Sequence, residues 1–296
     1  MRVFLTGATG FVGTAVAREL IGAGHTVLGV ARSGQAARTL ASRGVDPHRG
    51  DLTEPESFIA GARACDAVIQ CAFIHDFSRF AENIEIEKET VAAMLDALEG
   101  SGKPFIATSG VAMLAPGRTA TEEDQPPRQG RGETEALVRE AAGRGLRTAV
   151  VRLPPITHDS GDGGFLPMLV NIAREKGVAA YVGDGANRWP AGHRLDAAHL
   201  YRLALETGEP GAAYHAVGDE GVPTREIAGA IGRRLGLPTA SLGAEEAVNH
   251  FGWLGMFAGI DMPASSRLTQ QRLGWRLTHA RLIEDIDGAA ALAGGS

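Results

Sequence analysis

Short apolar runs alternate with longer amphipathic segments along the first half of the chain. The runs predict strands at 2–6, 25–30, 45–49, 67–72, 104–108 and 147–153. The segments between them predict helices directly after the first strand, from about 55, at about 79–99 and at about 132–143. The runs are continuous rather than alternating, as expected for parallel strands that are buried on both faces. The pattern therefore predicts an α/β fold around a parallel sheet.

A glycine-rich segment, TGATGFVG at 6–13, joins the first predicted strand to the first helix. Gly7 permits a tight turn, Gly10 lets the backbone approach a pyrophosphate, and Gly13 lets the helix pack closely on the strand. The unsatisfied N–H groups of the helix N-terminus then point toward the phosphates. A simple turn is the alternative reading, but the order of strand, glycine turn and helix favours a Rossmann-type, doubly wound sheet that binds a dinucleotide.

The end of the second strand bears on the choice of dinucleotide. It reads Ala31-Arg32-Ser33, without the acid that usually holds the ribose hydroxyls of NAD. Because arginine and serine suit a 2′-phosphate, we expect NADP(H) to be favoured over NAD(H), unless Arg32 is simply a solvated surface residue. Asp51 and Leu52 follow the third strand, where an adenine edge would be held; a turn aspartate is the other reading of Asp51.

Composition narrows the class of protein. The chain has 296 residues, 44% of them hydrophobic, which is enough to bury a large core. The net charge of −6 and the lack of a basic stripe argue against nucleic acid or a membrane surface as partner. No run approaches the roughly 18 apolar residues of a membrane span, so we expect a cytoplasmic protein. Two cysteines, Cys65 and Cys71, are too few for a zinc site, and we expect no metal.

Five motifs together resemble a known family. TGATGFVG at 6–13, GDL at 50–52, AVIQCAF at 67–73, FIATSG at 105–110 and VVRLPP at 150–155 resemble the extended branch of the short-chain dehydrogenase/reductase superfamily, of the NAD(P)-dependent epimerase/dehydratase type. The resemblance continues through 181–205 and 265–275, so it covers nearly the whole chain.

This resemblance implies a domain organisation. It implies a dinucleotide-binding Rossmann domain over 1–155 and a small, mainly substrate-binding part over 156–296, with a segment at about 190–217 that returns to the sheet. Members commonly dimerise through the helices near 79–99 and 132–143, so we expect a homodimer.

The resemblance also implies which residues contact the dinucleotide. They belong to the glycine loop and to the carboxyl ends of the strands. The residues are Gly7, Thr9, Gly10, Phe11, Val12, Gly13, Arg32, Ser33, Asp51, Leu52, Cys71, Ala72, Phe73, Thr108, Arg131, Leu153, Pro154, Pro155 and Ile156.

The chain departs from the family at its catalytic pair. No tyrosine stands four residues before a lysine among the three tyrosines and three lysines of the sequence. Counting back from Glu135 puts Arg131 at the family's lysine position and Pro127 at its tyrosine position, which resembles atypical members; another register selects Arg128. Arginine can hold the ribose and stabilise an oxyanion, but it cannot donate the proton near neutral pH.

Another group must therefore move the proton. Ser109, near the family's catalytic serine or threonine, and His158, after the strand that ends at 153, are the catalytic candidates beside Arg131. His75 leaves another strand at the same predicted edge of the sheet. Histidine titrates in the required range, although each of these residues has an alternative structural reading.

The later segment GDGANRWPAGHR at 183–194 predicts substrate contacts. We expect Asn187, Arg188, Trp189 and His193, together with His75, Ser109 and His158, to face the substrate, and Trp189 suggests a flat or apolar ligand. The favoured function is NADP(H)-dependent oxidation or reduction of a small carbonyl or unsaturated metabolite. The alternatives are an epimerase, dehydratase or lyase that retains its cofactor, and a non-catalytic dinucleotide sensor.

Overall fold

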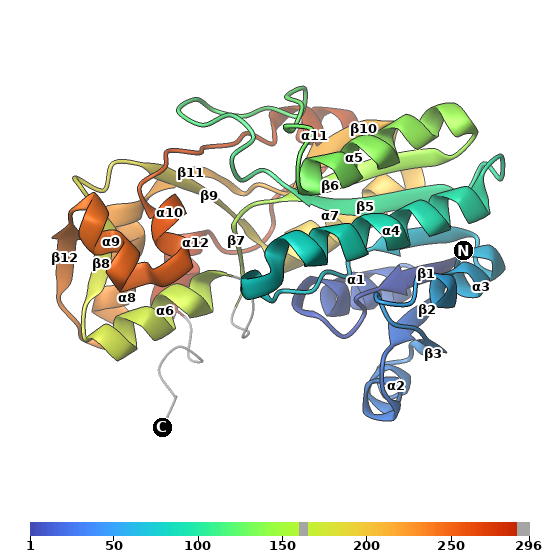
Figure 1. Ribbon diagram of the computed structural model, residues 1–296, viewed down its shortest axis with the longest axis horizontal. Coiled ribbons are helices and arrows are strands. Elements are labelled where there is room, and N and C mark those ends of the chain that lie inside the picture. The colour runs from blue at the N-terminus through green and yellow to red at the C-terminus, as the bar shows by residue number, and fades with distance from the viewer. Residues whose placement is uncertain (160–164, 289–296) are drawn as a thin grey trace.

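A seven-stranded sheet forms the centre of the larger of two lobes (Figure 1). The computed structural model describes residues 1–159 and 165–288. All strand pairs of this sheet are parallel. In spatial order the strands are β10 (Ala212–His215), β6 (Arg147–Leu153), β5 (Pro104–Gly110), β4 (Ala67–Gln70), β1 (Arg2–Thr6), β2 (Thr26–Ala31) and β3 (Asp46–Arg49).

Helices cover both faces of this sheet, and each face has its own apolar core. The core of one face includes side chains of α1 (Phe11–Gly22), α2 (Gly34–Ala41) and α7 (Arg194–Thr207). The core of the other includes side chains of α3 (Glu56–Ala64), α4 (Phe80–Leu98) and α5 (Arg131–Glu140). The short helices η1 (Phe77–Arg79) and η2 (Ala141–Arg144) adjoin α4 and α5. The predicted α/β, Rossmann-type fold is confirmed.

The smaller lobe is built around two short sheets. One has the order β11 (Asp219–Pro223), β9 (Arg188–His193), β7 (Ile156–His158), and the other pairs β12 (Thr239–Leu242) with β8 (Ala179–Val182). The helices are α6 (Phe165–Lys176), α8 (Thr224–Leu235), α9 (Ala244–Phe251), η3 (Gly252–Leu254), α10 (Gly255–Ala258) and α12 (Leu282–Gly288). Helix α11 (Arg267–Leu273) instead contacts α7 and β10 of the larger lobe.

The chain crosses between the lobes more than once. After β9 it returns to the large sheet through α7, which packs against α1, and through β10, which pairs with β6 from Ala212↔Ala149 onward. It then enters the smaller lobe again at β11. The carboxyl ends of β4, β5 and β6 consequently face the junction of the lobes, where open α/β sheets bind ligands.

The predicted strand at 45–49 differs from the other strands of the large sheet. The run at 45–49 is not a strand buried on both faces, because β3 is an edge strand with mostly exposed residues.

Helices α4 and α5 lie side by side (Figure 1), but the exposed positions of α4 include Glu82, Glu85, Glu89 and Asp96. The homodimer through these helices stays a prediction. No helix in the described part of the chain is long and apolar enough to span a bilayer.

Candidate active site

The glycine loop between β1 and α1 fits the pyrophosphate of a dinucleotide. Gly7 has φ +69°, and a Cβ there would lie 2.8 Å from the backbone nitrogen of Ala72. A Cβ on Gly13 would lie 2.1 Å from the carbonyl oxygen of Gly7, closer than any real contact. The Oγ1 of Thr6 accepts hydrogen bonds of 3.1 Å from the N–H groups of Cys71 and Ala72, which joins the loop to the end of β4. Only backbone fits at these positions, as phosphate binding at a helix N-terminus requires.

The end of β2 carries the residues expected to select the dinucleotide. Arg32 is exposed, whereas the hydroxyl of Ser33 accepts a 3.1 Å hydrogen bond from the N–H of Ala36 and so caps α2. Asp51 accepts hydrogen bonds from Thr53, chiefly from its N–H, and these lower the pKa of Asp51. The nearby positive charge of Arg32 acts in the same direction. Arg32 thus stays available for a ligand, while Ser33 and Asp51 each have a structural partner.

Arg131, at the first position of α5, is fixed at the carboxyl ends of β4 and β5. Its Nε and Nη2 donate to the two carboxylate oxygens of Glu87 at 3.0 and 2.8 Å, and Nη2 also donates to the carbonyl oxygen of Thr108 at 3.0 Å. The guanidinium carbon lies 4.5 Å from the ring centroid of Phe73. Glu87 on α4 is only 1% exposed, so the pair is a rigid fork rather than a surface contact.

The contacts of Arg131 leave one amino group unused. Three of the five N–H groups of a guanidinium are accounted for. The two on Nη1 have no partner among the residues that the structure describes. Arg128, selected by the other register, forms an ion pair with Glu140, and its side chain is 75% exposed. The geometry therefore puts Arg131, and not Arg128, at the carboxyl ends of β4 and β5.

Ser109 and Thr108 lie at the carboxyl end of β5, and Tyr201 of α7 reaches the same strand. Ser109 is 7% exposed, and its hydroxyl forms no hydrogen bond within the described ranges. Thr108 donates its hydroxyl proton to the carbonyl of Gln70, so the phenol of Tyr201 donates to Thr108 Oγ1 across 2.6 Å. Burial raises the pKa of Tyr201 well above its usual value. Tyr201 is therefore a fixed hydrogen-bond donor in the core, whereas the hydroxyl of Ser109 has no such fixed role within the described ranges.

The two candidate histidines lie in different surroundings. His75 follows β4, with its ring 5.2 Å from that of Phe73. The residue is exposed, but surrounding atoms partly desolvate its ring, and this, followed by the charge of Arg131, lowers its pKa. His158 is buried at the end of β7, where Nδ1 lies 2.7 Å from a carboxylate oxygen of Asp285 on α12. No hydrogen bond or ring contact joins His158 to Ser109 or Arg131 within 1–159 and 165–288. The structure thus brings His75 to Arg131 and places His158 with the smaller lobe.

The four expected substrate residues of 183–194 pack within the smaller lobe and at its junction with α7. The amide of Asn187 donates to the carbonyl of Ala258 at 2.8 Å, and Arg188 forms a forked pair with Asp261. Trp189 is buried in the apolar core. His193 accepts a hydrogen bond from the N–H of Leu195 and so caps α7, and its ring lies 5.5 Å from that of His158. Their role in substrate binding stays a prediction.

Sequence reasoning missed two residues near the site. Glu87 is one of several acids in α4, and the signal that could have found it is its place on the buried face with Asn83 and Thr90. Arg194 donates from Nη1 to the carbonyl of Phe11 at 3.2 Å, and its guanidinium lies 4.5 Å from the Phe11 ring centroid. Arg194 therefore ties the start of α7 to the helix of the glycine loop.

Within the described residues, no group of three histidine, cysteine, aspartate or glutamate side chains is arranged to hold a metal ion. Cys65 is buried and Cys71 is partly buried, and neither forms a disulfide. At the carboxyl ends of β4 and β5, the guanidinium of Arg131 can donate hydrogen bonds and stabilise negative charge. The roles of Ser109 and His75 in proton transfer stay predictions.

Known proteins resemble the chain at several levels. A protein of Schizosaccharomyces pombe described only as uncharacterized is 46% identical over 292 residues, which cover 97% of this chain and 98% of that protein. The 2-alkyl-3-oxoalkanoate reductase of Stenotrophomonas maltophilia is 29% identical over 80% of this chain and 77% of its own. The dTDP-glucose 4,6-dehydratase of Streptomyces venezuelae, solved with NAD and TYD bound, shares the fold with a TM-score of 0.78 at 18% identity, covering 99% of this chain and 96% of that one.

The family follows from the sequence match itself. The model of the NAD dependent epimerase/dehydratase family matches residues 3–217, from the first strand past the last strand of the large sheet. This span includes the glycine loop, Arg131 and Ser109. The chain belongs to the NAD-dependent epimerase/dehydratase family.

Proposed function

We propose that the protein is an NADP(H)-dependent oxidoreductase that acts on a small carbonyl or unsaturated metabolite. The observation that carries the proposal is the guanidinium of Arg131, fixed at the carboxyl ends of β4 and β5, whose Nη1 keeps two N–H groups without a partner among the described residues. A charged donor held rigidly before the reaction stabilises negative charge that develops on a substrate oxygen. A ketone-reducing relative, the 2-alkyl-3-oxoalkanoate reductase, supports the choice of a carbonyl substrate.

The glycine loop and the residues at the carboxyl ends of the strands each have a role in this proposal. The dinucleotide, when bound, supplies or accepts a hydride. The backbone N–H groups at the start of α1 hold its pyrophosphate, and Arg32 holds a 2′-phosphate. Nη1 of Arg131 binds the ribose and the developing oxyanion in place of the family's lysine. Glu87 holds the guanidinium so that it loses little freedom when ligand binds.

The proton requires a separate group, because arginine does not give up a proton near neutral pH. We place the donor at the hydroxyl of Ser109, which exchanges its proton with solvent directly or through His75. The lowered pKa of His75 makes this imidazole mainly neutral at pH 7 and able to accept a proton in the oxidative direction. His158 acts only if a water connects it to Ser109 or Arg131, because its Nδ1 already faces Asp285.

A cofactor assay tests the proposal directly. The purified protein is incubated with NADPH and a panel of ketones, 3-oxo esters and conjugated enones, and the loss of NADPH is followed. Steady consumption with at least one compound is expected. A product formed without net loss of NADPH would indicate an epimerase or a dehydratase instead. Tight NADPH binding with no turnover on any compound would favour a dinucleotide sensor.

A further inference from the structure

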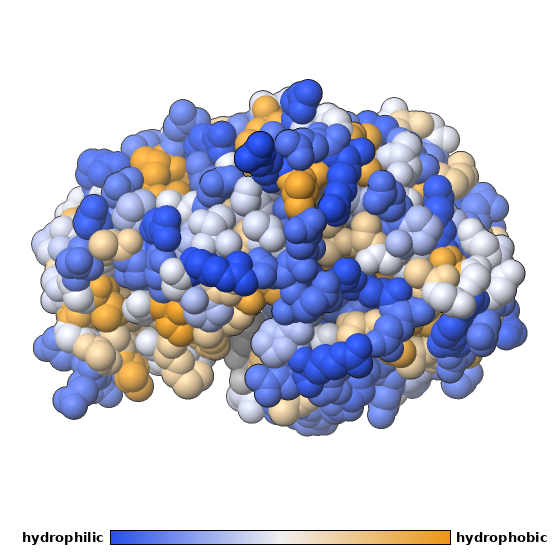
Figure 2. Space-filling model, turned by 90° about the horizontal axis from the view of Figure 1, so that it is seen from above, coloured by the Kyte–Doolittle hydropathy of each residue, from blue (hydrophilic) through white to orange (hydrophobic). Residues whose placement is uncertain are grey.

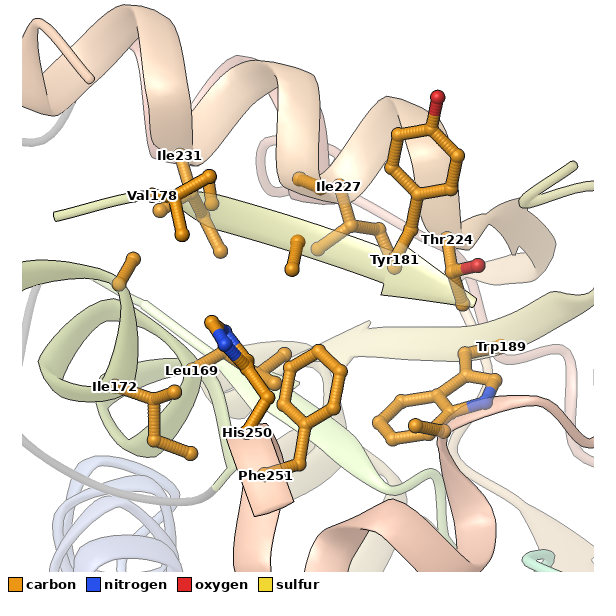
Figure 3. Close-up of a pocket in the computed structure, with 15 residues that line it drawn as sticks. Leu169, Ile172, Val178, Tyr181, Trp189, Thr224, Ile227, Ile231, His250 and Phe251 are labelled. Atoms are coloured by element: carbon orange, nitrogen blue, oxygen red, sulfur yellow. The ribbon is translucent and has the colours of Figure 1, made fainter. Parts of the chain in front are cut away.

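The phosphates of a dinucleotide need hydrogen-bond donors at a place that is open to a large ligand. The cavity of the smaller lobe in Figure 3 does not suit them, because its walls are mainly apolar and its volume is about 40 Å³, room for little more than a water molecule. Figure 2 shows instead a notch between the smaller lobe on the left and the larger lobe on the right. The glycine loop follows β1 at the carboxyl edge of the large sheet. The contacts of this loop therefore decide what else can hold the phosphates.

The start of α1 has no charged side chain of its own. Residues 6–17 contain no acidic or basic residue. The N-cap Gly10 has no side chain that could bond the first N–H groups of the helix. These N–H groups suit a pyrophosphate, but a full positive charge beside it must come from another element.

Arg194, the first residue of α7, brings a positive charge to this turn. Its guanidinium carbon lies 4.5 Å from the ring centroid of Phe11, the first residue of α1. Its Nη1 donates to the carbonyl oxygen of Phe11 at 3.2 Å. A guanidinium that stacks on an aromatic ring keeps the N–H groups at its edge available for hydrogen bonds. The charge of Arg194 thus lies beside the turn that follows the glycine loop.

Asp159 holds the guanidinium in this place. Nη2 of Arg194 forms an ion pair with Asp159, which follows β7 and whose side chain is 7% exposed. The contacts with Phe11 and Asp159 leave a second N–H on both Nη1 and Nη2 without a partner among the described residues. The side chain of Arg194 is 22% exposed, so a ligand can reach part of it.

We propose that Arg194 is a further dinucleotide-binding residue, whose Nη1 and Nη2 donate to an oxygen of the pyrophosphate that the start of α1 holds. An arginine that is already fixed suits this role, because its planar N–H groups bond phosphate oxygens and lose little freedom on binding. Asp159 acts through Arg194 as a positioning residue. The inference rests on the dinucleotide binding of the proposed function and is independent of hydride transfer.

The test measures binding and needs no turnover. NADPH and 2′-AMP are titrated into the full chain, since 2′-AMP has the adenine and the 2′-phosphate of NADPH but no pyrophosphate. Arg194→Met keeps an unbranched side chain without the charge. It should weaken NADPH by about tenfold, the effect of losing one hydrogen bond from a charged group, and leave the affinity for 2′-AMP unchanged. Arg194→Lys should recover part of the loss.

Arg202→Met is the matched control. Arg202 lies on the same helix, and its Nε donates to a carboxylate oxygen of Glu19 at 2.7 Å, about two turns further along α1 than Phe11. Its replacement removes a tie between the same two helices away from the glycine loop. Both affinities should therefore stay as they are in the unmutated protein.

The outcomes separate the two proposals. Undiminished NADPH affinity in a folded Arg194→Met protein would overturn the role of Arg194 alone. An equal loss for NADPH and 2′-AMP, or the same loss in Arg202→Met, would mark a structural contact and overturn it as well. If the unmutated protein bound neither NADPH nor NADH, the proposed function would fall together with this inference. Should Arg194→Met not fold, Arg194→Lys decides, and an unchanged ratio of the NADPH and 2′-AMP affinities would then contradict the proposal.

Discussion

Arg152 donates a hydrogen bond from Nη1 to Nε2 of His215 across 3.1 Å, and this contact fixes the protonation state of the histidine. Nδ1 of His215 lies 2.7 Å from the carbonyl oxygen of Ser265, to which it donates. Both ring nitrogens are therefore used by the neutral imidazole. Burial, and then the charge of Arg152, lowers the pKa of His215 to about 3.

This pair predicts acid sensitivity of the fold. Between the unfolded pKa of about 6.5 and the folded value of about 3, the unfolded chain binds a proton that the folded chain does not. The contribution of His215 to the free energy of unfolding is complete above pH 6.5 and falls by about 1.4 kcal/mol per pH unit as the pH drops through this window. Urea unfolding at pH 4.5 to 6.5 measures the slope. His215→Asn should reduce the slope by nearly that amount, and an unchanged slope would contradict the assignment.

The ion pair between Arg131 and the buried Glu87 predicts that turnover depends on Arg131 and not on the nearby Arg128. Arg131→Ala should lower turnover by at least about tenfold, since a charged donor at developing charge contributes a few kcal/mol. Arg131→Lys should recover part of the loss. Arg128→Ala is the matched control, because Arg128 forms a surface ion pair with Glu140 and should not affect turnover. Steady-state rates with saturating NADPH measure all three variants; full activity in Arg131→Ala would contradict the proposed role.

The exposed charge at the end of β2 predicts the dinucleotide preference. NADP(H) should bind more tightly than NAD(H), and Arg32→Asp should erase or reverse the preference, because an acid repels the 2′-phosphate and accepts hydrogen bonds from ribose hydroxyls. Arg18→Asp makes the same charge change at an exposed position of α1 and should leave the ratio of affinities unchanged. Calorimetric titration measures the ratio; equal affinities in the unmutated protein would defeat the prediction.

The close contact in the glycine loop predicts a local defect in cofactor binding. Gly13→Val would place a side chain against the carbonyl of Gly7 and should weaken dinucleotide binding while the chain stays folded. Gly22→Ala lies on the same helix with no atom within 4 Å of the new Cβ, so it should leave binding intact. Titration and thermal melts compare the two variants. Normal affinity in a folded Gly13→Val protein would mean that the loop is only a turn.

The dinucleotide loop could be predicted from sequence because its chemistry is local. Gly7, Gly10 and Gly13 lie within seven positions, and their need for small side chains comes from one turn of backbone. The position of Arg131 also followed from counting along the chain to Glu135. In both cases the residues that decide the geometry are close together in the sequence.

The rest of the site depends on partners that lie far apart in the chain. Glu87 becomes significant only when Arg131, 44 positions later, reaches it across α4 and α5. His158 does end a strand, but that strand belongs to the smaller sheet, and its partner Asp285 comes 127 positions later. Local patterns do not show which distant residues pair, so the sequence could not place His158, and the helical pattern of α4 could mark Glu87 as buried but not assign Arg131 as its partner.

The return of α7 and β10 to the large sheet has a consequence for dividing the chain. A fragment that ended near residue 155 would contain the whole glycine loop, yet β6 would lose its neighbour and expose an unpaired strand edge. The face of the sheet that Leu200, Tyr201 and Leu205 cover would be exposed as well. Such a fragment should aggregate rather than bind dinucleotide, so an expressed dinucleotide-binding unit must extend at least through β10.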